Sequence, residues 1–364
     1  MSKTIKNEIS IRQICAIFIA LTPVNKILTL PSILAGYTQN QLYIPLIISF
    51  AIDMLILFLI LKLGERFKNQ TFFDILTSSF GKTTAKVIFF ILGLHFFLKS
   101  FLPIIEQKHF VDNTLYEVFP NFISFFPLLI LSAYACVKGL KVLGRCADIS
   151  LWLTGVSILL IICFSITSSD LSNILPINKM PTYNTINACF TTIIWFTESL
   201  YMFLFLGHFK SEKKQNVKIM VSFLIASIIV LAIAVIFYGV FGDISKTQIF
   251  AVSDMTIYTT KIINVGRFDY LAIFLLLFSK IFSICMPVYM ATKYFEYAFG
   301  LKKALIPALI INGALLLSII ILEDKLYAIL AFSKSYVNWF FLFTAYILPI
   351  ILFIFARGKQ NGKA

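Results

Sequence analysis

The residues in this chain most capable of chemistry are charged side chains inside long apolar segments. There are five of them: Lys26, Asp53, Lys99, Glu198 and Lys280. An ionisable group in the middle of a bilayer costs at least about 2.5–3.5 kcal/mol, so it usually faces the protein interior or a wet cavity. Amines and carboxylates placed there can pair with each other, carry a proton or hold a charged ligand. These residues are therefore the first candidates for a functional site.

Lys26 lies in a part of the first apolar run that contains two prolines, at positions 23 and 31. A proline leaves the carbonyl one turn before it without its usual donor, and unpaired backbone at membrane depth persists only where protein or a cavity satisfies it. One interpretation is a proline kink with Lys26 extended toward the membrane surface. We favour a broken first helix, because Lys26 lies deeper than a surface-reaching lysine normally would. Its ligand site would include Thr22, Pro23, Val24, Asn25 and Lys26.

Glu198 lies midway through a later apolar run, in which no proline or glycine marks a break near the carboxylate. A carboxylate at this depth can carry a proton, hold the amine of a ligand or pair with Lys26. It can also form a purely structural ion pair between two helices. The candidate substrate-binding residues of this segment are Trp195, Thr197, Glu198 and Ser199.

The other charged residues inside the apolar runs are open to both structural and functional interpretations. We interpret Asp53 as structural, neutralised by Lys99 or Lys280. Lys99 follows His95 by one helical turn on the same face, although its position near the outer end of its run also suits a lysine that reaches the surface. Two serines four residues apart flank Lys280 and share a face. These segments add His95, Lys99, Ser279, Lys280 and Ser283 to the candidate substrate-binding residues.

The composition explains why these charges stand out. The chain is 59% hydrophobic and only 13% charged, with a mean hydropathy of +0.91, whereas a soluble protein has about a quarter of its residues charged. A net charge of +14 would suit a nucleic-acid-binding protein. However, Lys outnumbers Arg 26 to 5 and the basic residues lie in short loops, which is typical of a membrane protein and argues against nucleic acid.

The sequence offers little support for an enzyme or for a bound cofactor. It contains no phosphate-binding loop, no zinc-protease motif and no nucleophile elbow. The six cysteines form no Cys-x-x-Cys pair, and no histidine lies near them at metal-ligand spacing. We therefore expect no metal and no cofactor, and interpret the cysteines as small packing residues.

The apolar runs are long enough to cross a bilayer, which takes about 20 residues each. The longest connection between them, residues 242–268, has room for a short surface helix. We predict one transmembrane domain over residues 1–364. Its ten spans are residues 11–34, 43–62, 85–105, 121–138, 148–167, 186–208, 217–241, 269–292, 304–322 and 336–356.

The distribution of Lys and Arg predicts the orientation of these spans. The two termini and alternate loops together hold 21 basic residues, the other loops hold seven, and three lie within spans. Because cytoplasmic loops carry the excess of Lys and Arg, both termini are predicted to be cytoplasmic. An even number of spans follows from that placement.

Polar interruptions occupy comparable places in the first and sixth spans, which open the two halves of a ten-span chain. This arrangement is typical of inverted-repeat transporters, which hold substrate at the midplane between broken helices. The predicted fold class is an all-α integral membrane protein with a 5+5 repeat and broken helices 1 and 6, although the halves share no clear residue-by-residue similarity. An amino acid suits such a site, because helix N-termini attract its carboxylate and a buried carboxylate attracts its amine.

Four short segments resemble the B subunit of GerA-type spore germinant receptors, the endospore germination permease family of the amino acid–polyamine–organocation superfamily. The opening resembles the family's Ile-Ser-x-x-Gln, and the end of the first span its Leu-Pro. A cytoplasmic loop resembles its Gly…Arg-x-Ala pattern, and the start of the eighth span its Arg-x-Glu. The segments are residues 8–13, 30–32, 138–147 and 266–269.

This resemblance implies a ten-helix fold of the amino-acid-permease kind. It also implies a nutrient-sensing role beside an A and a C subunit in the inner membrane of the spore. The sequence departs from the family at two places. Residues 23–26 replace a glycine-containing stretch in the first span, and Thr197 replaces a glycine before the acidic residue of the sixth.

Three functional hypotheses follow from the sequence. The first is a germinant-receptor subunit that binds an amino acid or similar nutrient and triggers germination. The second is a proton-coupled amino acid permease with Glu198 as the proton carrier. The third is an assembly subunit without a ligand. In each case the partners include the lipid bilayer and exclude nucleic acid.

Overall fold

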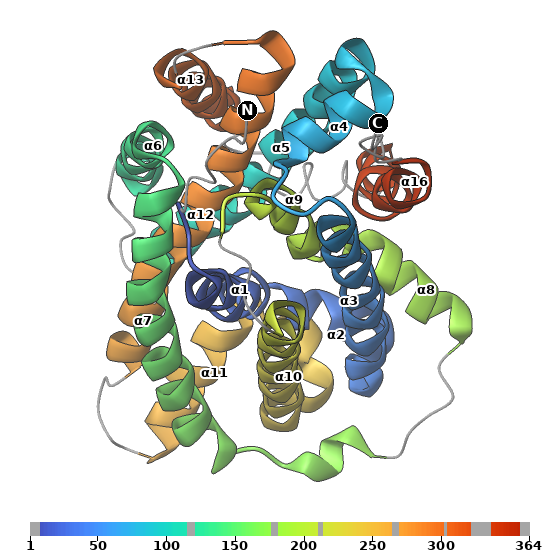
Figure 1. The fold of residues 1–364 in the computed structure, drawn as a ribbon. Helices are drawn as coiled ribbons and strands as arrows, with labels where there is room; N and C mark the ends of the chain where they lie inside the picture. Colours follow the sequence, from blue (N-terminus) through green and yellow to red (C-terminus); the bar gives the residue numbers. More distant parts are fainter. Residues whose placement is uncertain are drawn as a thin grey trace.

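A computed structural model describes residues 8–114, 121–175, 181–209, 214–263, 269–301, 304–321 and 336–356. Every regular element within these ranges is helical, as predicted (Figure 1). The helices are α1 Ile11–Lys26, α2 Leu30–Thr38, η1 Gln39–Gln41, α3 Tyr43–Arg66, α4 Phe72–Phe80, α5 Lys82–Thr114, α6 Asn121–Lys138, α7 Leu140–Ile166, η2 Leu171–Ile174, α8 Thr182–Thr191, η3 Ile193–Trp195, η4 Glu198–Leu200, α9 Tyr201–Phe205, α10 Gln215–Phe241, η5 Gly242–Thr247, α11 Ala251–Ile263, α12 Asp269–Phe299, α13 Leu305–Ile321, α15 Asn338–Leu342, η7 Phe343–Ile347 and α16 Leu348–Phe355.

Within the described ranges, six helical segments are long and apolar enough to cross a membrane. They include α3, α5, α7, α10 and α12, and the sixth runs from Asn338 to Phe355. Two bent pairs raise the number to eight if each pair is one span: α1 with α2, bent by 57°, and α8 with the segment ending at α9, bent by 52°. The predicted spans 121–138 and 304–322 fall on α6 and α13, whose apolar parts are shorter. The chain is thus a multi-pass membrane protein, and the count of ten stays a prediction.

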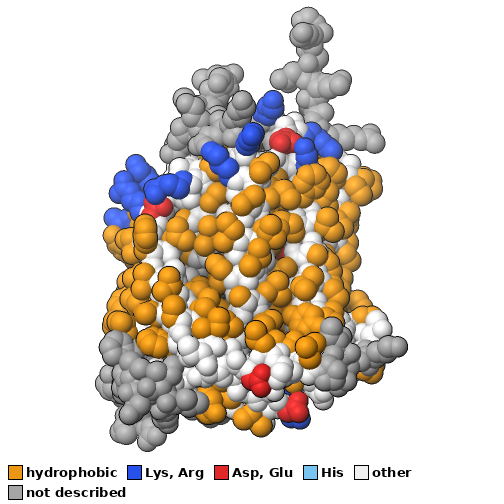
Figure 2. All heavy atoms as spheres, turned by 90° about the horizontal axis from the view of Figure 1, so that it is seen from below, with side chains coloured by type: hydrophobic (Ala, Val, Ile, Leu, Met, Phe, Trp, Pro, Cys, Tyr) orange, Lys and Arg blue, Asp and Glu red, His pale blue; other side chains and the backbone are white. Residues whose placement is uncertain are grey.

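The outer surface of the bundle has the pattern of a protein immersed in lipid. Figure 2 shows a broad apolar belt on the face drawn, with most of the blue Lys and Arg side chains of that face gathered at one end. Large apolar side chains are well exposed on several of the described helices, which in water would be costly. Examples are Leu55 at 63%, Trp152 at 76% and Ile354 at 61% exposure.

Several helices extend beyond the predicted spans. The helix α5 continues to Thr114 and α12 to Phe299, while α7 begins at Leu140 and makes most of the predicted loop 139–147 helical. A drop in hydropathy does not end a helix, because Lys, Arg, Glu and Gln are good helix formers. In α5 the first residues beyond the predicted span, Glu106 to Lys108, are even buried. The connection between residues 242 and 268 holds a helix, α11, as the sequence allowed, but most of its described side chains are buried, so it is not a surface helix.

The helix α1 lies inside the bundle, packed against α7, α10 and α12 (Figure 1). Most of its residues are buried, including the polar Thr22, Asn25 and Lys26. A helix that carries polar groups at membrane depth is stable only where other helices surround it. This central position explains how the first span keeps its lysine away from lipid.

The residues that open the chain form a capping box. Ser10 accepts a hydrogen bond from the backbone N–H of Gln13, and the Gln13 side chain accepts one from the N–H of Ser10. Arg12 and Gln13 both bond the carboxylate of Asp148 in α7, at 3.0 and 3.3 Å. The Ile-Ser-x-x-Gln opening therefore starts α1 and ties it to α7.

Both ends of the described chain lie at the same end of the bundle. The N–H of Glu8 bonds the carbonyl of His208 at 3.1 Å, in a loop that touches the segment after α3 through Gly207. Arg66, the last residue of α3, bonds the carbonyl of Phe353 at 2.9 Å. The end of α3 is thus close to both the first and the last described residues, as an even number of spans requires.

Candidate functional site

The first span is broken, but later along the chain than the sequence predicted. Pro23 lies inside α1, whose helical hydrogen bonds continue to Ile27 N–H on Pro23 O at 2.9 Å. The break falls between Lys26 and Leu30. Pro31 stands in the first turn of α2, where a proline is tolerated because its missing N–H would have no helical partner.

The carbonyls released by this break are satisfied by other elements. Lys280 Nζ donates to Val24 O at 3.3 Å, and the N–H of Ala251 at the start of α11 donates to Leu28 O at 2.7 Å. Backbone groups at membrane depth must find such partners. The break is therefore fixed by α11 and α12, which lie far from it in the sequence.

A second break interrupts the sixth predicted span, where no proline or glycine announces it. Helix α8 gives way to η3, and the chain leaves helical geometry at Phe196 and Thr197 before η4 and α9. The carbonyl of Phe196 accepts a hydrogen bond from the Tyr346 hydroxyl at 3.0 Å. A tertiary contact thus supports a break that the local sequence did not show.

The two breaks meet through a buried ion pair. Lys26 Nζ at the end of α1 lies 2.6 Å from Glu198 Oε2 at the start of η4, and both side chains are fully buried. The same ammonium lies 5.6 Å from the ring centroid of Phe50 and 5.0 Å from that of Phe196. Lys26 therefore does not extend toward the membrane surface.

Lys99 of α5 joins the same carboxylate from another direction. Its ammonium lies 3.4 Å from Glu198 Oε1, bonds the Thr197 hydroxyl and lies 5.6 Å from the ring centroid of Tyr201. Lys99 is buried, so the interpretation in which it reaches the surface is wrong. Glu198 is thus held between two ammonium groups from α1 and α5.

Glu106 is a site residue that the sequence analysis missed. Its carboxylate lies 2.7 Å from Lys280 Nζ, accepts a hydrogen bond from Trp195 Nε1 at 3.3 Å, and is bonded by the Thr29 hydroxyl. The predicted third span ended at residue 105, so Glu106 was left in a loop. Glu106 lies one helical turn after Leu102, which belongs to that apolar run. This spacing could have indicated that Glu106 is part of the same helix.

Asp53 is not neutralised as predicted. Its carboxylate is fully buried and accepts a hydrogen bond from the Ser199 hydroxyl. Among the described residues neither Lys99 nor Lys280 forms an ion pair with it, because their ammonium groups are held by Glu198 and Glu106. Ser199 therefore links Asp53 of α3 to the second break.

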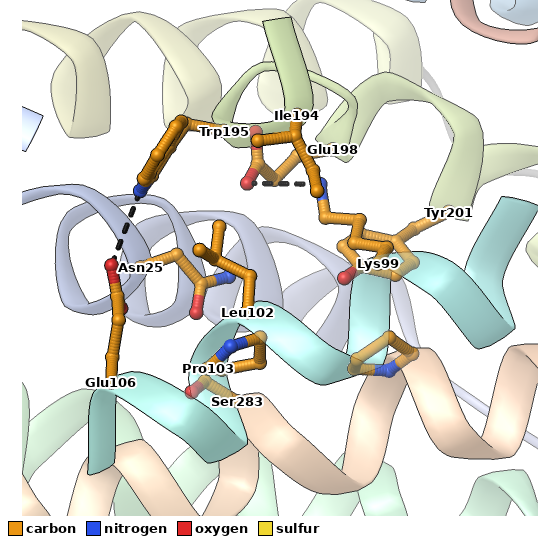
Figure 3. A pocket seen from close by; sticks show the side chains of 11 residues that line it. Asn25, Lys99, Leu102, Pro103, Glu106, Ile194, Trp195, Glu198, Tyr201 and Ser283 are labelled. Carbon is orange, nitrogen blue, oxygen red and sulfur yellow. Dashed lines mark hydrogen bonds and ion pairs between the residues drawn. The ribbon is translucent and has the colours of Figure 1, made fainter. Parts of the chain in front are cut away.

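A small cavity lies between the carboxylates of Glu106 and Glu198 (Figure 3). The cavity has a volume of about 10 Å³, which is room for about one water molecule. An amino acid does not fit this space as it stands. The lining residues are Asn25, Lys99, Leu102, Pro103, Glu106, Ile194, Trp195, Glu198, Tyr201, Ser283 and Pro287.

The structure brings most, but not all, of the predicted residues to this place. His95 bonds the Thr344 hydroxyl at 2.7 Å, and the Ser279 hydroxyl lies 3.4 Å from the Ser150 carbonyl, so both face other helices. Thr22 is buried, Pro23 lies within α1, and Val24 contributes only its carbonyl. The residues that gather around the cavity and the ion pairs are Asn25, Lys26, Lys99, Trp195, Thr197, Glu198, Ser199, Lys280 and Ser283.

Comparison with known proteins identifies the family. The model of the spore germination protein family, the spore permeases, matches residues 8–327. A search of curated proteins gave no significant match. The match covers most of the chain, including both broken helices and all three buried ion pairs described above. The chain is therefore a member of the spore germination protein family.

Proposed function

We propose that this chain is the membrane subunit of a nutrient germinant receptor in the inner membrane of the spore. It binds an amino acid or a similar small nutrient at the midplane and triggers germination together with an A and a C subunit. The observation that carries the proposal is the meeting of two broken helices at Lys26, Glu198 and Lys99, beside the cavity. In this proposal the fold has ten spans arranged as a 5+5 inverted repeat, and both termini are cytoplasmic.

The charges at the site suit a zwitterion. Glu198 can hold an ammonium group, and Lys99 can hold a carboxylate. Both are already paired within the protein, and the cavity has room for about one water molecule. An amino acid therefore has to displace internal pairs to bind. The conformation described here is then the unliganded one, and a nutrient shifts the equilibrium by binding better to a rearranged state.

A binding assay with purified protein tests this function. We expect at least one amino acid from a panel to raise the thermal stability of the wild-type protein. The Glu198→Gln variant should lose that response, and spores that carry it should germinate poorly. Glu296→Gln is a matched control, because Glu296 pairs with Lys293 at 2.8 Å outside the site. Loss of the response in both variants, or in neither, would contradict the assignment.

A second function is a proton-coupled amino acid permease in which Glu198 carries the proton. The full burial of this carboxylate favours it, since buried carboxylates form proton relays in transporters. Uptake of radiolabelled amino acid into proteoliposomes separates the two functions. A permease accumulates solute when a proton gradient is applied, whereas a receptor binds the nutrient without accumulating it.

A further inference from the structure

The end of the Lys26 side chain is enclosed by groups that together recognise an ammonium ion. Glu198 Oε2 lies 2.6 Å from Nζ, and the rings of Phe50 and Phe196 have their centroids 5.6 and 5.0 Å from it. The two rings pack edge to face with their centroids 5.1 Å apart. Aromatic faces and a carboxylate are the groups that proteins use to bind ammonium ligands.

The enclosure is buried and is built from separate elements. Phe50 comes from α3, Phe196 from the second break and Glu198 from η4, and all three side chains are buried. Lys99 contacts the other oxygen of Glu198 at the longer distance of 3.4 Å, so without Lys26 the carboxylate keeps this one partner while Oε2 loses its ammonium. A buried carboxylate oxygen without a partner is costly, which favours a cation at the place of the Lys26 ammonium. Lys280 provides a comparison, because its partners are the Glu106 carboxylate and the Val24 carbonyl.

We propose that Phe50, Phe196 and Glu198 form an ammonium cage, a binding site for a primary ammonium group, and that Lys26 is its internal ligand. While Lys26 occupies the cage, the amine of a free ligand is excluded. Removal of the Lys26 ammonium opens the cage to small alkylammonium ions. The chemical class that the cage accepts is thus a primary amine in its charged form.

The cage has a consequence for nutrient binding, and this part rests on the proposed function. An amino acid that places its ammonium in the cage releases Lys26, which can then pair with the ligand's carboxylate. The exchange keeps the number of buried charges balanced, so it avoids the cost of an unpaired charge. It also breaks the Lys26–Glu198 contact that holds the end of α1 against the second break.

The Lys26→Ala variant with n-propylammonium as probe tests the cage. The part of a lysine side chain beyond Cβ has the size and charge of n-propylammonium. We expect Lys26→Ala to melt at a lower temperature than the wild type in detergent. Millimolar n-propylammonium chloride should then raise its melting temperature by roughly 5 °C, as expected for a ligand near saturation. The wild type should not respond, since Lys26 fills the cage.

Three controls isolate the cage from non-specific effects. Propan-1-ol has the same shape without the charge, so it should not rescue Lys26→Ala. In Lys26→Met the cage stays filled, so n-propylammonium should have no effect. In Lys280→Ala the probe should give a smaller rescue, because the ammonium of Lys280 is held by the Glu106 carboxylate and the Val24 carbonyl and not by a carboxylate and two aromatic rings. Equal rescue of Lys280→Ala, or rescue by propan-1-ol, would overturn the proposal.

The outcome remains decisive if Lys26→Ala does not fold when expressed alone. In that case the protein is expressed with n-propylammonium in the medium, and recovery of folded, monodisperse protein supports the cage. Absence of recovery, with Lys26→Met folding normally, overturns it.

The failure of the cage and the failure of the proposed function are distinguishable. If n-propylammonium rescues Lys26→Ala but no variant binds an amino acid, the cage is supported and nutrient binding is contradicted. If the wild type binds an amino acid but n-propylammonium does not rescue Lys26→Ala, nutrient binding is supported and the cage is contradicted. If both hold, the wild type should bind its amino acid but not n-propylammonium, since only a ligand with a carboxylate offers the released Lys26 a new partner.

Discussion

At the scale of residues, the site described above brings together three buried lysines and three buried carboxylates. Lys26 and Lys99 share Glu198, Lys280 pairs with Glu106, and the carboxylate of Asp53 is bonded by the Ser199 hydroxyl. A buried ion pair adds little net stability, but removal of one partner is costly because it leaves an unpaired charge. These pairs therefore make the positions of α1, α5 and α12 depend on one another.

The pair between Glu106 and Lys280 gives a direct test of this dependence. Glu106→Gln leaves the Lys280 ammonium buried without its carboxylate, and we expect it to destabilise the protein by about 3 kcal/mol. The double variant Glu106→Gln with Lys280→Met should recover a large part of the loss, because it removes the unpaired charge. Thermal unfolding of the wild type, Glu106→Gln, Lys280→Met and the double variant in one detergent measures the coupling energy between the two side chains. Additive losses would show that the two groups act independently.

His208 gives the protein a dependence on pH at the end of the bundle that holds both described chain ends. Burial lowers the pKa of His208 below its usual value of 6.5, while the Glu8 carboxylate, 3.4 Å away, acts in the opposite direction. The folded protein therefore takes up this proton less readily than the unfolded chain. Stability should be complete above about pH 6.5 and should fall as the pH drops through that value toward the lower folded pKa.

Melting temperatures measured between pH 8 and pH 5 check this expectation. His208→Gln keeps a hydrogen-bonding group beside Glu8 but cannot take up the proton. Its melting temperature should therefore fall less steeply with decreasing pH than that of the wild type. Parallel curves for the two proteins would show that other groups cause the pH dependence.

At the scale of elements, the breaks and turns are fixed by contacts between distant segments. Gly207, just after α9, has φ +77°, and a Cβ placed there would lie 2.6 Å from the carbonyl oxygen of Gln70. The loop that follows the second broken span is thus pressed against the loop that precedes α4. Only glycine permits both the backbone geometry and this close approach.

Two alanine substitutions separate geometry from crowding. Gly139 at the start of α7 has φ +83° but open space around the position of a Cβ, so Gly139→Ala should cost about 1–2 kcal/mol from the backbone alone. Gly207→Ala adds a clash with backbone atoms and should cost roughly 2–5 kcal/mol. Thermal unfolding of both variants provides the comparison. Equal losses of stability in the two variants would mean that the backbone at Gln70 moves away from the added methyl group without a cost in free energy.

At the scale of the whole molecule, the orientation in the membrane can be tested from two exposed lysines. Lys68 follows the end of α3, whereas Lys246 lies in η5, which packs against η1 just before α3. The two side chains are therefore at opposite ends of the bundle. From the distribution of Lys and Arg we expect the end with Lys68 to face the cytoplasm.

Single cysteines at these positions in a cysteine-free background report the orientation. In intact cells a membrane-impermeant maleimide should label Lys246→Cys and should label Lys68→Cys only after permeabilisation. Because both variants replace an exposed lysine, differences in intrinsic reactivity are small. The reverse pattern of labelling would place both termini outside.

Much of the fold was predictable because the bilayer imposes a simple rule on the sequence. A segment that crosses it needs about 20 apolar residues, so the positions of the spans follow from hydropathy along the chain. The same rule singled out Lys26, Lys99, Glu198 and Lys280, since a charge within an apolar run must be buried in protein. Glu106 was not identified as a buried charge because the predicted span ended at residue 105, although α5 continues to Thr114.

The sequence by itself thus determined the all-helical membrane class and the presence of a polar interior, because both follow from local hydropathy. The tertiary structure alone decided the partners of each charge. Lys26 meets Glu198, 172 residues away, and Lys280 meets Glu106 rather than Asp53. It also decided the places of the two breaks, which lie where Lys280, Ala251 and Tyr346 satisfy the released carbonyls. These pairings and break positions depend on how each helix is rotated about its axis and packed against the others. Hydropathy along the chain does not determine that rotation.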